Sequence, residues 1–263
     1  MDKELESSFT LTTKILLGKP LSGLEAYSAW LGQSVPLPYP AKSALSDKEV
    51  WVAPEQYFLG KRFNPARIIS MDEIGKIEPQ KVKAPELEGM DVTALVKKVV
   101  MPHAYYCGNF RYKTYMDVAR ASGTGDASHV DMVEDTYHNT KNVAYANCVL
   151  YENQCVFGGH TLTYAQFCIH AYNCNSVVRC FELEGCNSCS DSYFCHNCEG
   201  LAECMFCFNS KSLRYAIGNV EVGKEKYMEI KKKVLEGIAN ELEKNKKLER
   251  SIFNIGRHAK RVQ

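Results

Sequence analysis

The sequence lacks a long hydrophobic run, an apolar N-terminal segment and an excess of charge of either sign. No stretch of about 18 consecutive apolar residues occurs, which excludes a membrane-spanning helix. The first residues, MDKELESSFTL, are polar and acidic and lack the apolar core of a secretory signal. The net charge is +1 at pH 7, which argues against binding to nucleic acid or to a membrane surface. We therefore expect a cytoplasmic protein.

Cysteine is the abundant residue type: the 263-residue chain has 12, and eleven of them lie between Cys148 and Cys207. A reducing compartment disfavours disulfides, so dense cysteines indicate either metal ligands or small buried hydrophobic residues. Leu, Ile and Val are scarce in the same segment.

The neutral total charge conceals three regions of different character. Residues 142–210 carry a net charge of −5, residues 211–263 carry +7, and residues 1–141 carry −1. Together with the change in composition near Asn139, this predicts three domains: a mixed N-terminal region at 1–138, a cysteine-rich unit at 139–220, and a C-terminal helix with a basic tail at 221–263.

The cysteines from Cys168 to Cys207 all stand at multiples of three, and from Cys180 the chain divides into nine-residue C-x5-C-x2 units. A repeat of three drifts by about 60° per step around an α-helix, so a helix would scatter these cysteines over every face. Stacked short strands place equivalent residues above one another. The spacing therefore predicts a β-solenoid, with Cys168, Cys186 and Cys204 (18 residues apart) in successive coils.

The stretches SCSDSYFCHNCEG and ECMFCFNSKSLRYAIGNVEVGKEKY carry a resemblance. With the surrounding residues 139–230 they resemble cysteine-rich repeat proteins found in genomes of uncultivated bacteria, archaea and their viruses. The resemblance implies a repeat architecture, and a virion is the other location it suggests. It implies no activity.

Three CxxC pairs lie in the repeat and are the candidate metal ligands. A CxxC pair can present two thiolates to one ion, and four thiolates satisfy Zn²⁺ or an iron–sulfur cluster. However, only five residues separate one pair from the next, which is tight for a zinc ribbon, and the repeat continues where no CxxC exists. We favour packing without a cofactor over zinc or iron–sulfur binding. The candidate ligands are Cys186, Cys189, Cys195, Cys198, Cys204 and Cys207.

The rest of the chain predicts shorter elements. Glu49–Leu59 and Arg67–Ser70 are expected as strands, Asp91 as the N-cap of a short helix over 91–100, and Ala121–Ser128 as a loop. After Gly223, a helix of about 25 residues has an apolar stripe that should dock on the preceding domain or on a second subunit. The stripe consists of Tyr227, Ile230, Val234, Ile238 and Leu242.

No catalytic set is evident among the other polar residues. A helix over 128–138 could cluster His129, Asp131, Asp135 and His138, with the last three on one face. The cluster would be a carboxylate–histidine metal site or, as we favour, a solvated face. Cys107 with His103 is a weak nucleophile–base pair, and a buried structural thiol is preferred. The histidines within the repeat are expected to be packed or exposed rather than ligands; they are His160, His170 and His196.

The sequence thus predicts an α+β chain: an irregular N-terminal region, a cysteine-rich β-solenoid and a C-terminal amphipathic helix. The favoured function is non-enzymatic: a structural or interaction subunit of a larger assembly, such as a virus particle. Its protein partner, another copy or a different chain, would bind the solenoid ends and the C-terminal helix. The alternative is a zinc or iron–sulfur protein.

Overall fold

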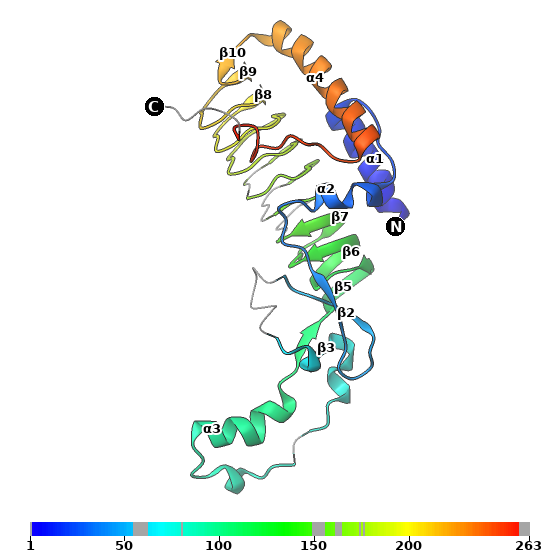
Figure 1. Ribbon diagram of the computed structural model, residues 1–263, viewed down its shortest axis with the longest axis vertical. Coiled ribbons are helices and arrows are strands. Elements are labelled where there is room, and N and C mark those ends of the chain that lie inside the picture. Colours follow the sequence, from blue (N-terminus) through cyan, green and yellow to red (C-terminus); the bar gives the residue numbers. More distant parts are fainter. Residues whose placement is uncertain are drawn as a thin grey trace.

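The computed structural model describes residues 2–54, 63–79, 81–148, 156–160, 165–173, 175 and 177–257. The molecule is elongated (Figure 1): a stack of coils forms its long axis, two helices run along one side, and a small group of strands with a helical arm lies at one end. The coils form a β-solenoid, which confirms the predicted α+β solenoid class. In the described part of the chain, no helix is long and apolar enough to cross a membrane.

Parallel pairing between successive coils builds the solenoid. Strand β5 (Phe110–Ala119) pairs with β6 (Gly123–Glu134), which pairs with β7 (Thr140–Asn147). Parallel bridges continue the ladder to β8 (Ala202–Met205) and β9 (Arg214–Ile217). Strand β10 (Val220–Glu221) turns back antiparallel on β9 and ends the stack.

Each side of a coil is three residues long, as Tyr193, Phe194 and Cys195 illustrate. Tyr193 pairs with Met205 in the next coil, Phe194 adopts a left-handed conformation (φ 51°), and Cys195 is fully buried inside. One inward residue per side explains why the cysteines recur at multiples of three. Left-handed corners explain the asparagine, glycine, serine and aspartate between them, because these residues tolerate positive φ best. Such corners include Gly185, Ser188, Asp191, Asn197, Gly200 and Asn209.

The period of the coil differs from the predicted one. Bridged residues are 12 apart along most of the C-terminal half, as in Phe181 with Tyr193, so a coil has four sides. The nine-residue unit therefore covers three sides and does not close a coil. Cys168 and Cys204 are 36 residues apart, so they lie on the same side of the solenoid but are separated by three coils. Cys186 is one and a half coils from each and lies on the opposite side. The expected stacking of these three cysteines in successive coils is therefore wrong. Cys168 stacks instead with Cys180, and Cys186 with Cys198.

The solenoid also begins earlier than the predicted boundary at residue 139. The segment expected as a loop, Ala121–Ser128, lies largely in β6, and residues 128–138 continue that strand and its turn instead of forming a helix. These early coils contain no cysteine and fill their interior with alanine and valine, for example Val130, Val133 and Val143. A cysteine-based signal could not find them.

The interior is a narrow core of small side chains. Its columns combine cysteine with alanine, valine, leucine and serine, and most of these inward residues are buried. Four inward residues meet in each coil, so bulkier side chains would collide across the axis.

One outer face of the solenoid is covered by helices α1 (Lys3–Leu17) and α4 (Lys224–Asn245). The face presents a column of large residues at bridge positions, and both helices bury their apolar sides against it (Figure 1). The predicted stripe of α4 is confirmed in part: Tyr227, Ile238 and Leu242 are buried, whereas Ile230 and Val234 are only half-buried. The buried face also includes Leu235 and Ala239, which the predicted stripe did not contain. The column consists of Phe157, Ile169, Phe181, Tyr193 and Met205.

Helix α1 was not predicted from the sequence. Asp2 caps its first turn by accepting hydrogen bonds from the amides of Glu4 and Leu5, and Gly18 ends it in a left-handed conformation. After α1, the short helices η1 (Leu24–Tyr27) and α2 (Ser28–Leu31) lead to the solenoid surface. There Gly158 is required, because a Cβ on it would lie 2.1 Å from the Leu31 carbonyl oxygen.

A small β unit lies beyond the first coil. Strand β1 (Tyr39–Lys42) pairs antiparallel with β2 (Glu49–Val52), and β3 (Ile68–Ser70) pairs parallel with β4 (Tyr106–Gly108). The predicted strands at 49–59 and 67–70 thus correspond to β2 and β3, although residues 55–62 lie outside the described residues. The short helices η3 (Pro65–Arg67) and η4 (Met71–Lys76) flank β3.

Between η4 and β4 the chain forms an arm that projects from the body (Figure 1). Its helical turns are η5 (Ala84–Leu87), α3 (Val92–Leu95), the π-helical η6 (Val96–Val100) and η7 (Met101–His103). Asp91 caps α3 through the amide of Ala94, as predicted. None of these four turns has a buried residue, so the arm is not held by a core of its own.

Candidate functional site

The six candidate metal ligands occupy inward positions on different sides of the coils. Cys186, Cys189 and Cys195 belong to one coil, and Cys198, Cys204 and Cys207 to the next. All six are at most 4% exposed. Two cysteines of one CxxC pair therefore stand on adjacent sides of the solenoid, each on its own three-residue unit.

Each of these thiols has a hydrogen-bond acceptor in the backbone. The Sγ of Cys195 donates to the carbonyl oxygen of Tyr193 at 3.4 Å, and the Sγ of Cys198 donates to those of His196 (3.2 Å) and Cys207 (3.4 Å). The other four thiols make the same contact with the carbonyl two residues earlier. A small side chain with a weak donor thus fits a core that is lined with carbonyl groups.

The stacked thiols also influence each other's ionisation. Hydrogen bonding to Cys189 and Cys198, together with burial, raises the pKa of Cys186, while the contact with Cys186 lowers the pKa of Cys198. The same relation raises the pKa of Cys195 and lowers that of Cys207. In each stacked pair one thiol has a raised pKa and the other a lowered pKa, so the two thiols titrate as a unit.

The cysteines that the structure describes form no compact group of three or more ligands. Among the described residues, the one set of three or more metal-ligating side chains with donor atoms within 4.8 Å of one another is Asp2, Asp117 and His129. All cysteines of the described residues are free thiols. A tetrahedral thiolate site needs four sulfurs about 2.3 Å from one ion, and placement on separate sides does not supply this arrangement.

Substitution of Cys195 tests the packing interpretation. We expect Cys195→Ser and Cys195→Ala each to lower the free energy of unfolding by about 1–2 kcal/mol, with serine no worse than alanine. The reason is Ser192, an inward residue on a neighbouring side, which is fully buried and donates to the carbonyl of Ser190 at 2.8 Å. Denaturant unfolding measures the effect, and Cys107→Ser, at an exposed thiol, should change little. A much larger loss for serine than for alanine would contradict this expectation.

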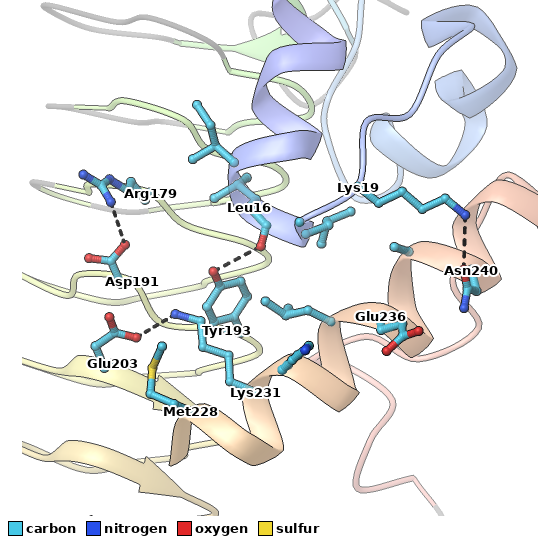
Figure 2. A pocket seen from close by; sticks show the side chains of 16 residues that line it. Leu16, Lys19, Arg179, Asp191, Tyr193, Glu203, Met228, Lys231, Glu236 and Asn240 are labelled. Atoms are coloured by element: carbon cyan, nitrogen blue, oxygen red, sulfur yellow. Dashed lines mark hydrogen bonds and ion pairs between the residues drawn. The ribbon is translucent and has the colours of Figure 1, made fainter. Parts of the chain in front are cut away.

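A groove of about 700 Å³ lies between α1, α4 and the solenoid (Figure 2). Leu16, Tyr193 and Leu235 supply part of its apolar floor, and the Tyr193 hydroxyl donates to the Leu16 carbonyl at 3.2 Å. Its volume lies within the range of small-molecule sites.

Charged residues on the groove wall are already paired with one another. Arg179, Asp191 and Glu203 occupy the same place in three successive coils, and Arg179 lies 3.9 Å from Asp191. Lys231 of α4 reaches back to Glu203 at 2.7 Å and lies 5.1 Å from the centre of the Tyr193 ring. The acidic solenoid and the basic C-terminal region therefore attract each other within one chain. Lys232 and Glu236 also line the groove and take no part in these pairs.

The first coil is the terminal coil of the solenoid, and the segment after β3 contacts only part of it, where the Arg111 amide lies 3.3 Å from the Met71 sulfur. Strand β5 is the terminal strand of its sheet and pairs with β6 alone. Most of its residues are exposed, including Tyr112 (53%), Tyr115 (56%) and Met116 (54%). An exposed terminal strand with apolar side chains is a surface on which another strand can pair.

The polar residues singled out in the sequence do not form a joint site. Residues 129 and 131 lie on β6, where Asp131 binds Arg120 and His129 approaches Asp2 and Asp117. Asp135 and His138 follow in the turn. Cys107 is exposed, which corrects the expectation that it is buried.

The histidines within the repeat also lie apart. His170 is buried with its ring 4.7 Å from that of Trp30, and His196 pairs with Glu184 at 2.5 Å. His160 is partly exposed. Among the described residues, none of the three belongs to a metal-ligating group.

Sequence reasoning missed two features: the exposed apolar side of the arm and the meeting of Asp2 with His129. The arm shows valine and leucine at helical spacing (92, 95, 96 and 99), a signal that was available but short. Asp2 meets His129 only through the docking of α1, which no local pattern could indicate. No family model, curated protein or solved structure matches this chain.

Proposed function

We propose that this protein is a non-enzymatic structural subunit that associates with further copies of itself through the open end of its solenoid. The observation that carries the proposal is β5, which has a strand neighbour on one side and exposes Tyr112, Tyr115 and Met116. A second solenoid offers strands of the same spacing and corner geometry, so a second copy is the occupant that matches this edge.

The arm supports the same proposal. It leaves Val92 79% exposed and Met101 54% exposed, with Leu95, Val96 and Val100 also exposed. Isolated exposed apolar residues are ordinary, but a contiguous set on a helix without any core contact marks an interaction surface. The arm could bury these apolar side chains against a partner that binds at the end of the solenoid.

The C-terminal helix contributes less to such an assembly than its sequence indicates. Its apolar stripe is buried against the solenoid of the same chain, and Lys231 is paired with Glu203. The open coil and the arm therefore remain as the contact surfaces, and we place the C-terminal helix among the elements that stabilise the subunit.

Substitution on β5 tests this function. The wild-type protein should form dimers or larger species with rising concentration, and Met116→Lys should shift the distribution toward the monomer by at least tenfold in dissociation constant. A lysine on an exposed strand disfavours pairing, because its charge would be buried in the contact. Size-exclusion chromatography with light scattering over a concentration series measures this.

The matched control is Met228→Lys on α4, where the methionine is similarly exposed (46%) but lies far from β5. It should leave the association unchanged. If the wild-type protein is monomeric up to high micromolar concentration, or if both variants dissociate equally, the proposal is wrong.

The rival function, zinc or iron–sulfur binding by Cys186, Cys189, Cys195, Cys198, Cys204 and Cys207, has less support. Their placement on separate sides and their hydrogen bonds to carbonyls weigh against shared coordination. Elemental analysis of protein purified without oxygen would favour the rival if it found stoichiometric iron, or zinc that is lost in Cys198→Ser.

A further inference from the structure

We propose that Asp2, Asp117 and His129 form a binding site for a first-row divalent transition-metal ion such as Zn²⁺ or Co²⁺. The three residues come from separate parts of the chain: Asp2 from the start of α1, Asp117 from β5 and His129 from β6. This site is separate from the cysteine core, and its Asp117 lies on β5 directly after Met116 of the surface used in the proposed association.

The distances between the donor atoms fit one ion. The Nδ1 atom of His129 lies 3.2 Å from a carboxylate oxygen of Asp2 and 3.5 Å from one of Asp117. Ligands held ~2.0–2.1 Å from a tetrahedral ion are ~3.3 Å from one another. An imidazole and two carboxylates therefore already stand close to coordination geometry, and the remaining position is free for water.

A proton alone satisfies this arrangement poorly. Nδ1 carries at most one hydrogen, yet two carboxylates converge on it. One oxygen of Asp2 is engaged by the amides of Glu4 and Leu5, which fixes this carboxylate in place. A divalent cation would neutralise both carboxylates at once and bind the deprotonated nitrogen.

The surroundings are acidic. A cavity of about 460 Å³ lies beside the site and is lined by Asp2, Glu25, Asp117 and Asp131, with Arg120 as the cation among its lining residues. Arg120 is shared between Glu25 and Asp131. Because Arg120 is engaged by other carboxylates, the negative charge of Asp2 and Asp117 would be neutralised by His129 or by a bound cation.

A further side chain, which would supply a third oxygen and a fourth donor, lies in the same column of corners. Asp117 and His129 are register neighbours in β5 and β6, and Asn142 is the neighbour of His129 in β7. All three have positive φ, which places them on successive corners. The Oδ1 atom of Asn142 is buried and has no hydrogen-bond partner, although an amide oxygen normally has one when buried. The imidazole of His129 is therefore flanked by an oxygen donor from Asp117 on one neighbouring strand and one from Asn142 on the other.

Titration of the full-length protein with Co²⁺ and Zn²⁺ near pH 7.5 tests the site. We expect one equivalent to bind and to raise the melting temperature by about 5–10 °C at 100-fold excess over Kd. Asp117→Asn and His129→Asn, which both suit a left-handed corner, should weaken binding at least tenfold while the metal-free melting temperature changes little.

The matched control is Asp126→Asn, another aspartate corner on β6, where the side chain pairs with Lys113. It should bind metal like the wild type. The Co²⁺ spectrum should lack the thiolate-to-metal charge-transfer absorption that cysteine ligands produce. Absence of binding, equal binding by Asp117→Asn and wild type, or a thiolate band would each overturn the proposal.

Discussion

Replacement of Phe181 by alanine is expected to lower the free energy of unfolding by about 3–5 kcal/mol. The ring is fully buried between the solenoid and the N-terminal helices, with centroid distances of 6.0 Å to Trp30 and 5.1 Å to Phe194. Solenoid coils on both sides fix its neighbours, so the cavity cannot collapse. Equilibrium denaturation measured by circular dichroism would give the difference.

Phe208 supplies the control for this prediction. Like Phe181, it occupies a bridge position, where it pairs with His196 of the preceding coil. It lies on a side of the solenoid that the helices do not cover, and it is partly exposed. Phe208→Ala should cost about 1 kcal/mol or less. Equal losses in the two variants would show that the helices do not create the stabilising core.

Stability should also depend strongly on pH, with its maximum near pH 4.5, where the opposing effects of one buried histidine and two buried glutamates balance. Burial lowers the pKa of His170 to about 3, because the charged ring would be desolvated. An unfolded histidine binds a proton below about pH 6.5. The unfolded state therefore binds more protons between pH 6.5 and 3, and stability falls as the pH decreases through this window, by up to about 4–5 kcal/mol.

Glu182 acts in the opposite direction. Burial raises its pKa to about 8, although the carboxylate accepts a hydrogen bond from the Ile252 amide at 3.1 Å. The folded state then holds a proton between pH 4.5 and 8 that the unfolded state has released. Stability from this group is full below pH 4.5 and is lost as the pH rises toward 8. Burial raises the pKa of Glu134 to about 8 as well.

Two variants separate these contributions. His170→Phe should abolish much of the loss on the acid side, and phenylalanine is accepted at the equivalent left-handed corners Phe194 and Phe206. Glu182→Gln should flatten the decline above pH 4.5 while keeping the contact with Ile252. Unfolding free energies measured from pH 4 to 9 would show these changes, and a flat wild-type profile would contradict both assignments.

The cysteine spacing predicted the solenoid because the inward residue of each side is a local property. Every three-residue side repeats the order bridge, corner and interior, so the interior residue recurs with period three in the sequence itself. The pairs Cys168 with Cys180, Cys186 with Cys198 and Cys195 with Cys207 also carried the correct coil length of 12. The nine-residue unit obscured this coil length, because nine is also a multiple of three but corresponds to only three of the four sides.

The apolar stripe of α4 was likewise readable, since helical spacing fixes which residues share a face. The early coils were not, because alanine and valine at period three resemble many other segments. The unpredicted α1 has buried threonines, Thr12 and Thr13, in its apolar side, which weakens its amphipathic pattern.

What the sequence determined by itself is therefore the three-residue side, the small buried interior and the amphipathic C-terminal helix, all of which depend on residues near one another in the chain. The tertiary structure decided the four-sided coil, the outer face that the helices cover, and the meeting of Asp2 with His129. These depend on how corners close and how distant segments dock, and the free energy of such contacts comes from burial between segments far apart in sequence.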